Sequence, residues 1–152
     1  MGLLAARVIS VWVVASDLAT ASEKTMAGRI LVVDDNRDAA NTLARLLSVL
    51  GHEARVAYGG DEALDIATGF PFDMAFIDLG MPNLNGYETC ARLRQNRMSG
   101  DVVMVALTGW SQEKDIRQAL ESGFDVHVAK PMSEQRLNEL LALLVPKGLS
   151  AP

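Results

Sequence analysis

Two adjacent carboxylates, Asp34 and Asp35, directly follow the apolar run of residues 30–33. Neighbouring acids repel each other, and aspartate is a poor strand former, so the pair needs an explanation. A purely structural explanation is that a buried strand ends here and that Asp35 caps the next helix. The chemical explanation is that the two acids hold a cation. The second explanation gains weight if other functional groups end neighbouring strands.

Three further polar residues, Asp78, Thr108 and Lys130, also stand at the ends of apolar stretches. Each has an ordinary alternative on its own: a turn former, a strand exit and a solvated loop charge. In a parallel sheet, however, ligands bind outside the carboxyl ends of the strands. If the stretches are neighbouring parallel strands, these side chains therefore converge on one rim.

Such a set of groups has a recognisable chemistry. Two carboxylates about 4 Å apart repel by roughly 4 kcal/mol at an effective dielectric constant near 20, and Lys130 offsets only part of this. Mg²⁺ removes the repulsion, prefers oxygen ligands and bridges readily to phosphate. An aspartate can then attack a phosphoryl group as a nucleophile. Lys130, the Thr108 hydroxyl and backbone N–H groups can stabilise the phosphoryl oxygens, and Gly109 leaves room for them.

The elements that must position these groups alternate along the chain. Apolar patterning predicts strands at residues 29–33, 53–58, 74–78, 102–107 and 126–129, and helices at residues 37–50, 61–68, 86–95, 111–122 and 133–144. Gly51 is expected to end the first helix, and Ser111 and Ser133 to cap the last two. Five strands alternating with five helices predict an α/β fold, a doubly wound parallel sheet covered on both faces.

Composition excludes several classes of function. The chain has 152 residues, a net charge of −5, 49% apolar residues and only 5% aromatic residues, so one domain with an aliphatic core is expected. No basic stripe is visible, which argues against nucleic acid as a partner. Cys90 is the only cysteine, so an internal disulfide and a cysteine metal cluster are excluded. His52 and His127 are too far apart in sequence to suggest a metal site.

The N-terminal residues 1–27 differ from the rest and are assigned as an extension to a domain over residues 28–146, with a tail at residues 147–152. Residues 2–15 are apolar except Arg7 and Ser10, but the run at residues 8–15 is too short to span a membrane. It resembles the apolar region of a signal peptide, with possible cleavage near Ala21. Met26 looks like a natural start, so a mis-assigned start or a loosely docked extension is the favoured interpretation.

Four ordered motifs carry a resemblance to a known family. They are LVVDDN at residues 31–36, FIDLGMPNLNG at residues 76–86, ALTG at residues 106–109 and GFDVHVAKP at residues 123–131. Asp35, Asp78, Thr108 and Lys130 are separated by 43, 30 and 22 residues. From about residue 28 to residue 145 the chain resembles the receiver domain of bacterial two-component response regulators. Its tail segment is most similar to receivers attached to, or cut from, hybrid histidine kinases.

The resemblance implies a flavodoxin-like (CheY-like) fold with strand order 2-1-3-4-5. It also implies that Asp78 is the phosphoacceptor. Asp34, Asp35, Asp78 and the backbone carbonyl of Gly80 would hold Mg²⁺.

The resemblance assigns the remaining groups of the rim as well. Lys130 would pair with the phosphoryl group, its bond to Pro131 would be cis, and Thr108 would move to hydrogen-bond a phosphoryl oxygen. His127 stands at the switch position, where the family commonly has Tyr or Phe. A ring that can ionise near neutral pH leaves the behaviour of this switch open.

Two positions bear on how long a phosphorylated state lasts. In the family, the residues two after the phosphoacceptor and two after the threonine border the approach of the hydrolytic water. Here these residues are Gly80 and Trp110, and neither can orient a water molecule. Slow self-dephosphorylation is therefore expected, and Trp110 either shields the site or binds a partner.

The expected role is a single-domain phosphorelay protein in the cytoplasm, and not an enzyme beyond self-dephosphorylation. A histidine kinase or histidine phosphotransferase would be the phosphoryl donor, and the downstream protein is unknown. The expected output surface lies on the fourth helix, fifth strand and fifth helix, and includes Trp110, Ile116, Ala119, His127 and Lys147.

Two other classes stay open at this point. A pseudo-receiver would act only as a docking module, although the complete acidic set argues against it. An Mg²⁺-dependent phosphatase with an aspartate nucleophile would also use acids at strand ends. That class usually carries a second acid two residues after the nucleophile, where this chain has Gly80. A flavin site is weaker, because the acids would repel a phosphate that has no metal.

Overall fold

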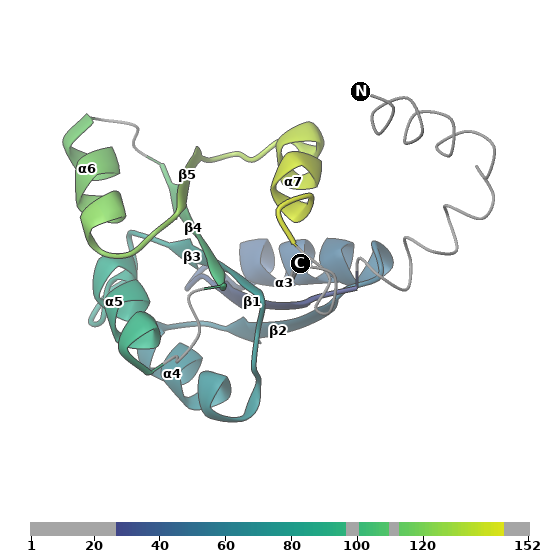
Figure 1. Ribbon diagram of the computed structural model, residues 1–152, viewed down its shortest axis with the longest axis horizontal. Helices are drawn as coiled ribbons and strands as arrows, with labels where there is room; N and C mark the ends of the chain where they lie inside the picture. The colour runs from purple at the N-terminus through teal and green to yellow at the C-terminus, as the bar shows by residue number, and fades with distance from the viewer. Residues whose placement is uncertain (1–26, 97–100, 110–112, 145–152) are drawn as a thin grey trace, which may run out of the picture.

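The computed structural model describes residues 27–96, 101–109 and 113–144, in which strands and helices alternate (Figure 1). The strands are β1 (Arg29–Val33), β2 (Glu53–Ala57), β3 (Met74–Asp78), β4 (Val103–Thr108) and β5 (Val126–Ala129). The helices are α3 (Arg37–Val49), α4 (Gly60–Gly69), α5 (Gly86–Asn96), α6 (Glu113–Glu121) and α7 (Glu134–Leu141). Each strand or helix predicted from the sequence is present, with ends that differ by a few residues.

The five strands form one parallel sheet in the order β2-β1-β3-β4-β5. Helices α3 and α7 cover one face of the sheet, and α4, α5 and α6 cover the other (Figure 1). The predicted doubly wound α/β fold with strand order 2-1-3-4-5 and five helices is therefore confirmed.

Strand β3 shows why the sequence chooses this arrangement. All five of its residues are buried, because it lies in the middle of the sheet with helices on both sides. Met74 and Phe76 pack into the core under α3 and α7, whereas Ala75 and Ile77 pack into the core under α4, α5 and α6. A strand that is buried on both faces reads as a continuous apolar run, and here the run stops at Asp78.

Helix ends correct two details of the prediction. The residue that caps α3 is Asn36, whose side chain accepts a hydrogen bond from the backbone N–H of Ala39 at 3.0 Å, and not Asp35. Asp35 is therefore not needed for capping. At the other end Leu50 is the cap residue, and Gly51 follows it with a φ of +99°, a conformation that favours glycine. Ser133 caps α7 as predicted, and the predicted cap Ser111 lies outside the described residues.

Cys90 and His52 contribute to packing. Burial raises the pKa of the Cys90 thiol to about 12, so the thiol stays protonated in the core under α5. His52 is buried, and its Nδ1 accepts a hydrogen bond from the backbone N–H of Gly28 at 3.0 Å. Burial also lowers the pKa of His52, in keeping with a neutral ring that acts as an acceptor.

The predicted extension and tail lie almost wholly outside the described residues, which begin at residue 27 and end at residue 144. Among the helices of this described part, none combines the length and the apolar character that crossing a membrane requires.

Gly86 sets how closely α5 approaches the end of β3. A methyl group at this position would collide with the carbonyl oxygen of Asp78 and would lie 2.7 Å from the Cα of Leu79. Both contacts are with backbone, so they cannot be relieved by rotating a side chain. Gly69, at the end of α4, has open space around it instead.

We expect Gly86→Ala to lower the free energy of unfolding by about 1–3 kcal/mol, the usual cost of forcing extra atoms into a packed region. Gly69→Ala, the matched control, should be neutral or stabilising by up to about 1 kcal/mol, because alanine is the better helix former. Urea unfolding of the two variants measures both changes. Equal stability of Gly86→Ala and wild type would contradict the close approach.

Candidate functional site

The register of the sheet brings the predicted groups to one rim. Val33 lies opposite Ile77, so Asp34, the next residue, is level with Asp78. Thr108 lies opposite Ala129, so Lys130 is the first residue beyond that pair. The backbone N–H of Lys130 donates to the carbonyl oxygen of Thr108 at 2.7 Å, which fixes the start of the loop that carries the lysine.

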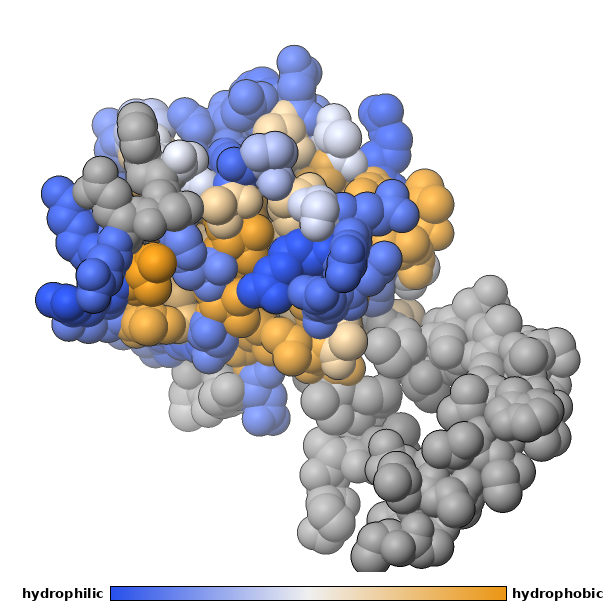
Figure 2. Space-filling view, turned by 90° about the horizontal axis from the view of Figure 1, so that it is seen from above, coloured by the Kyte–Doolittle hydropathy of each residue, from blue (hydrophilic) through white to orange (hydrophobic). Residues whose placement is uncertain are grey.

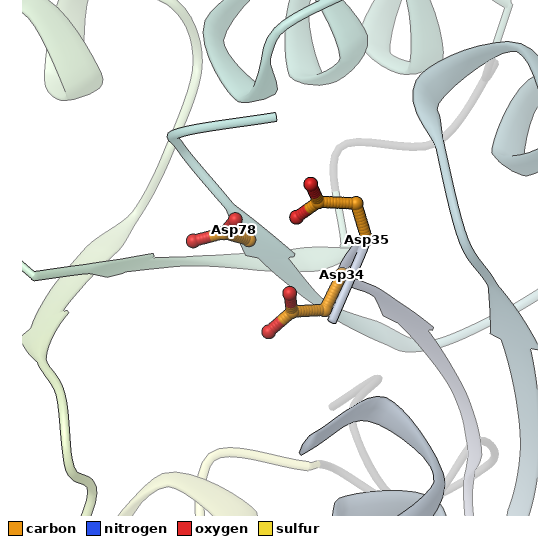
Figure 3. Close-up of side chains that lie close together, drawn as sticks. All are labelled: Asp34, Asp35 and Asp78. Atoms are coloured by element: carbon orange, nitrogen blue, oxygen red, sulfur yellow. The ribbon is translucent and has the colours of Figure 1, made fainter. Parts of the chain in front are cut away.

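Three carboxylates, those of Asp34, Asp35 and Asp78, meet at this rim, extending from the ends of two neighbouring strands (Figure 3). One oxygen from each lies within 4.8 Å of the others. Asp34 and Asp78 are buried, and Asp35 is exposed. An all-carboxylate donor set of this size fits a hard cation such as Mg²⁺, which takes oxygen ligands and keeps several waters. The residues present therefore fit the metal that the resemblance implies.

Lys130 is the positive charge among these acids. Its Nζ lies 3.1 Å from Oδ2 of Asp34 and 3.0 Å from Oδ1 of Asp78, so one ammonium pairs with both buried carboxylates. The peptide bond between Lys130 and Pro131 is cis. The lysine thereby joins the strand end of β5 to those of β1 and β3.

The pKa shifts follow from burial and from these pairs. Burial raises the pKa of Asp78, and the charges of Asp34 and Asp35 raise it further, against the opposing effect of Lys130. Burial acts to lower the pKa of Lys130, but its hydrogen bonds to Asp78 and Asp34 outweigh it, so the pKa is raised. Lys130 therefore keeps its positive charge, whereas burial and repulsion from Asp34 and Asp35 disfavour the ionised form of Asp78.

Backbone groups hold Asp34 in place. Its Oδ1 accepts a hydrogen bond from the backbone N–H of Asn36 at 2.9 Å, and its own N–H donates to the carbonyl oxygen of Ala57 at 3.1 Å. With Oδ2 bound to Lys130, both oxygens of this carboxylate have partners. Asp34 is therefore the best-fixed acid of the three.

A hollow of about 360 Å³ opens beside Asp78. It is lined by Asp78, Leu79, Gly80, Tyr87, Thr108, Gly109 and Asp115. A methyl group added at Gly80 or at Gly109 would meet nothing within 4 Å, so both glycines border open space. The structure thus places a space large enough for a phosphoryl group next to the predicted phosphoacceptor and the threonine.

Tyr87 and Asp115 are two lining residues that the sequence analysis missed. Both are half-buried and lie in the first turns of α5 and α6. Burial raises the pKa of the Tyr87 hydroxyl, and the charge of Asp115 raises it further, so these side chains are close enough to interact. The pattern that predicts the rim marks residues close to strand ends, and a residue seven positions beyond Thr108 gives no comparable signal.

A larger apolar groove of about 920 Å³ runs from the acidic rim between α3 and α7. Asp34 and Lys130 line the groove at the rim, and Leu43, Leu46 and Leu137 lie along the two helices. Leu43 and Leu46 are half-buried, although each is large and apolar. The groove is continuous with the charged rim and offers an apolar contact surface beside it.

The expected output surface needs one correction. Ala119 is fully buried in the core between α6 and the sheet, because it lies on the inward face of that amphipathic helix. It is therefore not a surface residue. Ile116 is half-buried, and Trp110 and Lys147 lie outside the described residues. His127 on β5 is half-buried, and its Nε2 has no hydrogen-bond partner within the described part of the chain.

The protein is thus a doubly wound α/β domain with three acids and a lysine at the carboxyl ends of its strands, where ligands bind in such sheets. A family model for the response regulator receiver domain matches residues 30–142. The chain belongs to this family of two-component signalling domains.

Two curated relatives and one solved structure illustrate the similarity. Response regulator MprA of Mycobacterium bovis is 37% identical over 117 residues, which cover 77% of this chain and 49% of MprA. Sensor histidine kinase RcsC of Salmonella typhi is 35% identical over 114 residues, covering 75% of this chain and 12% of RcsC. A response regulator structure from Burkholderia pseudomallei shows 34% identity and a TM-score of 0.67, covering 76% of this chain and 65% of that chain. The chain thus spans half or less of these curated relatives.

The raised pKa of Asp78 predicts how stability depends on pH. The folded protein binds a proton at Asp78 more tightly than the unfolded chain does, so ionisation of this group as the pH rises opposes folding. Without divalent cations at pH 7, Asp78→Asn should raise the melting temperature by roughly 2–4 °C, equivalent to about 1 kcal/mol. The difference should shrink below the ordinary aspartate pKa, near pH 4.

Asp65→Asn, at an exposed position on α4, is the control and should change little. Excess Mg²⁺ should stabilise wild type more than Asp78→Asn, since binding to the folded state adds to its stability. Thermal melts over a pH series with EDTA or Mg²⁺ measure both effects. A melting temperature of Asp78→Asn below that of the wild type at pH 7 with EDTA would contradict a destabilising charge at Asp78.

Proposed function

We propose that the domain accepts a phosphoryl group on Asp78 in an Mg²⁺-dependent reaction and relays the signal through a changed protein-binding surface. The observation that carries this proposal is the position of the Asp78 carboxylate. It lies 3.0 Å from the Lys130 ammonium and within 4.8 Å of two other carboxylates, and it borders the hollow that Thr108 also lines. A nucleophilic carboxylate, a cationic partner and space for the transferred group thereby share one rim.

The chemistry is a transfer between two nucleophiles. A carboxylate oxygen of Asp78 attacks the phosphorus of a phosphohistidine, and the bond from phosphorus to the histidine nitrogen breaks. The Lys130 ammonium then interacts with the phosphoryl oxygens, and the Thr108 hydroxyl and backbone N–H groups of the loops donate hydrogen bonds to them. Because the sheet already fixes the positions of Asp78 and Lys130, these two groups need little reorganisation during the transfer.

Asp34, Asp35, Asp78 and the backbone carbonyl of Gly80 are the groups that would hold Mg²⁺. When bound, the ion supplies positive charge that neutralises the carboxylates and the incoming phosphoryl oxygens. The Burkholderia pseudomallei structure contains a phosphorylated aspartic acid and a calcium ion, which supports this assignment by similarity.

The phosphoryl donor in this proposal is a histidine kinase or a histidine phosphotransferase in the cytoplasm. An amphipathic donor helix fits the apolar groove between α3 and α7, because the groove ends at Asp34 and Lys130. A phosphohistidine on such a helix would reach the rim while apolar side chains contact Leu43 and Leu46. The domain itself is an acceptor and has no further enzymatic activity beyond self-dephosphorylation.

The output surface in this proposal is the side of the molecule where β5 lies between α6 and α7. Figure 2 looks onto this side and shows apolar side chains gathered in its middle, with hydrophilic side chains around them. Thr108 on β4 and His127 on β5 belong to neighbouring strands of the sheet. A movement of Thr108 toward the phosphoryl group changes the surroundings of the His127 ring, so the ring changes position. This shifts a pre-existing conformational equilibrium of the surface.

Phosphoramidate with Mg²⁺ should add one phosphoryl group to the wild type, because Asp78 is the nucleophile at the rim. Asp78→Asn should lose the added group, whereas Asp65→Asn should keep it. Intact-mass analysis with and without EDTA measures the addition and its dependence on the metal. An unchanged mass gain in Asp78→Asn would sink the assignment of the phosphoacceptor.

The groove predicts a difference between protein and small-molecule donors. Leu43→Gln keeps the side-chain volume but adds a polar group, so transfer from a histidine phosphotransferase should slow by about tenfold, equivalent to about 1.4 kcal/mol. Phosphorylation by phosphoramidate should be unchanged. The experiment uses whichever purified phosphotransferase in a panel transfers fastest to the wild type.

Leu120→Gln is the matched control, since Leu120 is 53% exposed on α6, away from the groove. It should leave transfer from the protein donor unchanged. Similar slowing by both variants, or loss of reaction with phosphoramidate in Leu43→Gln, would count against the groove as the donor site.

A further inference from the structure

The hollow beside Asp78 contains one carboxylate outside the three-acid cluster. Asp115 extends from the first turn of α6 and lines the same space as Asp78, Thr108 and Gly109. It is half-buried, in contrast to its exposed neighbour Glu113 on the same helix. A negative charge in the first turn of a helix is favoured by the helix dipole.

The position of Asp115 matters because the loop after β3, residues 79–85, contains no acidic side chain. Gly80 has no side chain and borders open space. Among the described residues that line the hollow, Asp78 itself and Asp115 are the only acids. Hydrolysis of an aspartyl phosphate needs a water molecule on the far side of the phosphorus from Asp78, and a group that accepts its proton.

We propose that Asp115 orients the water that hydrolyses the phosphorylated Asp78 and accepts its proton. This inference rests on the proposed function, because it requires Asp78 to be phosphorylated. The water oxygen bonds to phosphorus as the bond from phosphorus to the Asp78 oxygen breaks, and Asp78 leaves as a carboxylate. The proton taken up by Asp115 returns to the product, so aspartyl phosphate and water become aspartate and dihydrogen phosphate.

Tyr87 is the neighbour that positions this acid. It lines the hollow together with Asp115, and its hydroxyl pKa is raised by burial and by the charge of Asp115, so it stays a neutral donor. A neutral hydroxyl beside a carboxylate donates a hydrogen bond to it or to a water between them. In the proposed mechanism, Tyr87 thereby helps to keep the carboxylate directed into the hollow.

Whatever the absolute lifetime of the phosphorylated state, its decay should depend on Asp115. Wild type and variants are loaded with phosphoramidate and Mg²⁺ and then freed of the donor. The phosphoryl group should be lost about ten- to a hundredfold more slowly from Asp115→Asn than from the wild type, up to the low end of what a positioned base contributes. Asp115→Glu should restore much of the rate. Tyr87→Phe should slow decay less than Asp115→Asn does.

Glu113→Gln is the matched control, because Glu113 lies two residues away on α6 and does not line the hollow. Its phosphoryl group should be lost at the wild-type rate. Each variant should take up as much phosphoryl group as the wild type and melt at the same temperature. Two results would overturn the role of Asp115 alone. One is loss of the phosphoryl group from Asp115→Asn at the wild-type rate, and the other is slow loss in Asp115→Asn together with equally slow loss in Asp115→Glu. No loading of the wild type would overturn the proposed function and this inference together.

Discussion

Repulsion among three carboxylates at one rim is the constraint on which the rest of the structure depends. The fold forces Asp34 and Asp78 to the same level, because the strands that carry them are hydrogen-bonded neighbours. Lys130 relieves part of the repulsion by pairing with both. The remaining excess of negative charge makes the rim suitable for a cation, and it disfavours the ionised form of Asp78.

The precision of the rim comes from backbone structure. Strand β3 is held by neighbours on both edges and by a core on each face, so the position of Asp78 is set before its side chain makes any contact. A backbone hydrogen bond between Lys130 and Thr108 does the same for the lysine. Gly86 then allows α5 to approach the end of β3 without displacing it. Charged groups are thereby kept close together by interactions that do not involve charge.

Much of this arrangement was predictable from the sequence, because parallel strands concentrate chemistry at their carboxyl ends. An apolar run precedes or ends at each of the residues Asp34, Asp78, Thr108 and Lys130. That pattern is sufficient to predict that their side chains meet at one rim. Asp115 could not be found in this way, since its approach to the hollow depends on how α6 packs against the sheet.

The details of helix α3 and helix α6 show where the pattern was insufficient. Asn36 and Asp35 are both good capping residues, and sequence alone does not determine which of them begins α3. Ala119 was assigned to the surface because it belongs to a helix expected to bind partners, but the rotation of α6 places it inward. Rotation about a helix axis depends on packing with the rest of the fold.

The division of the core into two separate clusters has a consequence for how such domains diversify. The residues of the groove extend from α3 and α7 and rest on one cluster, while α4, α5 and α6 rest on the other. The acids belong to the strand ends between them. Substitutions on one face can therefore accumulate during evolution while the opposite face and the reactive rim remain unchanged. If the groove receives the phosphoryl donor as proposed, a duplicated gene can acquire a new donor by altering two helices, without rebuilding its chemistry.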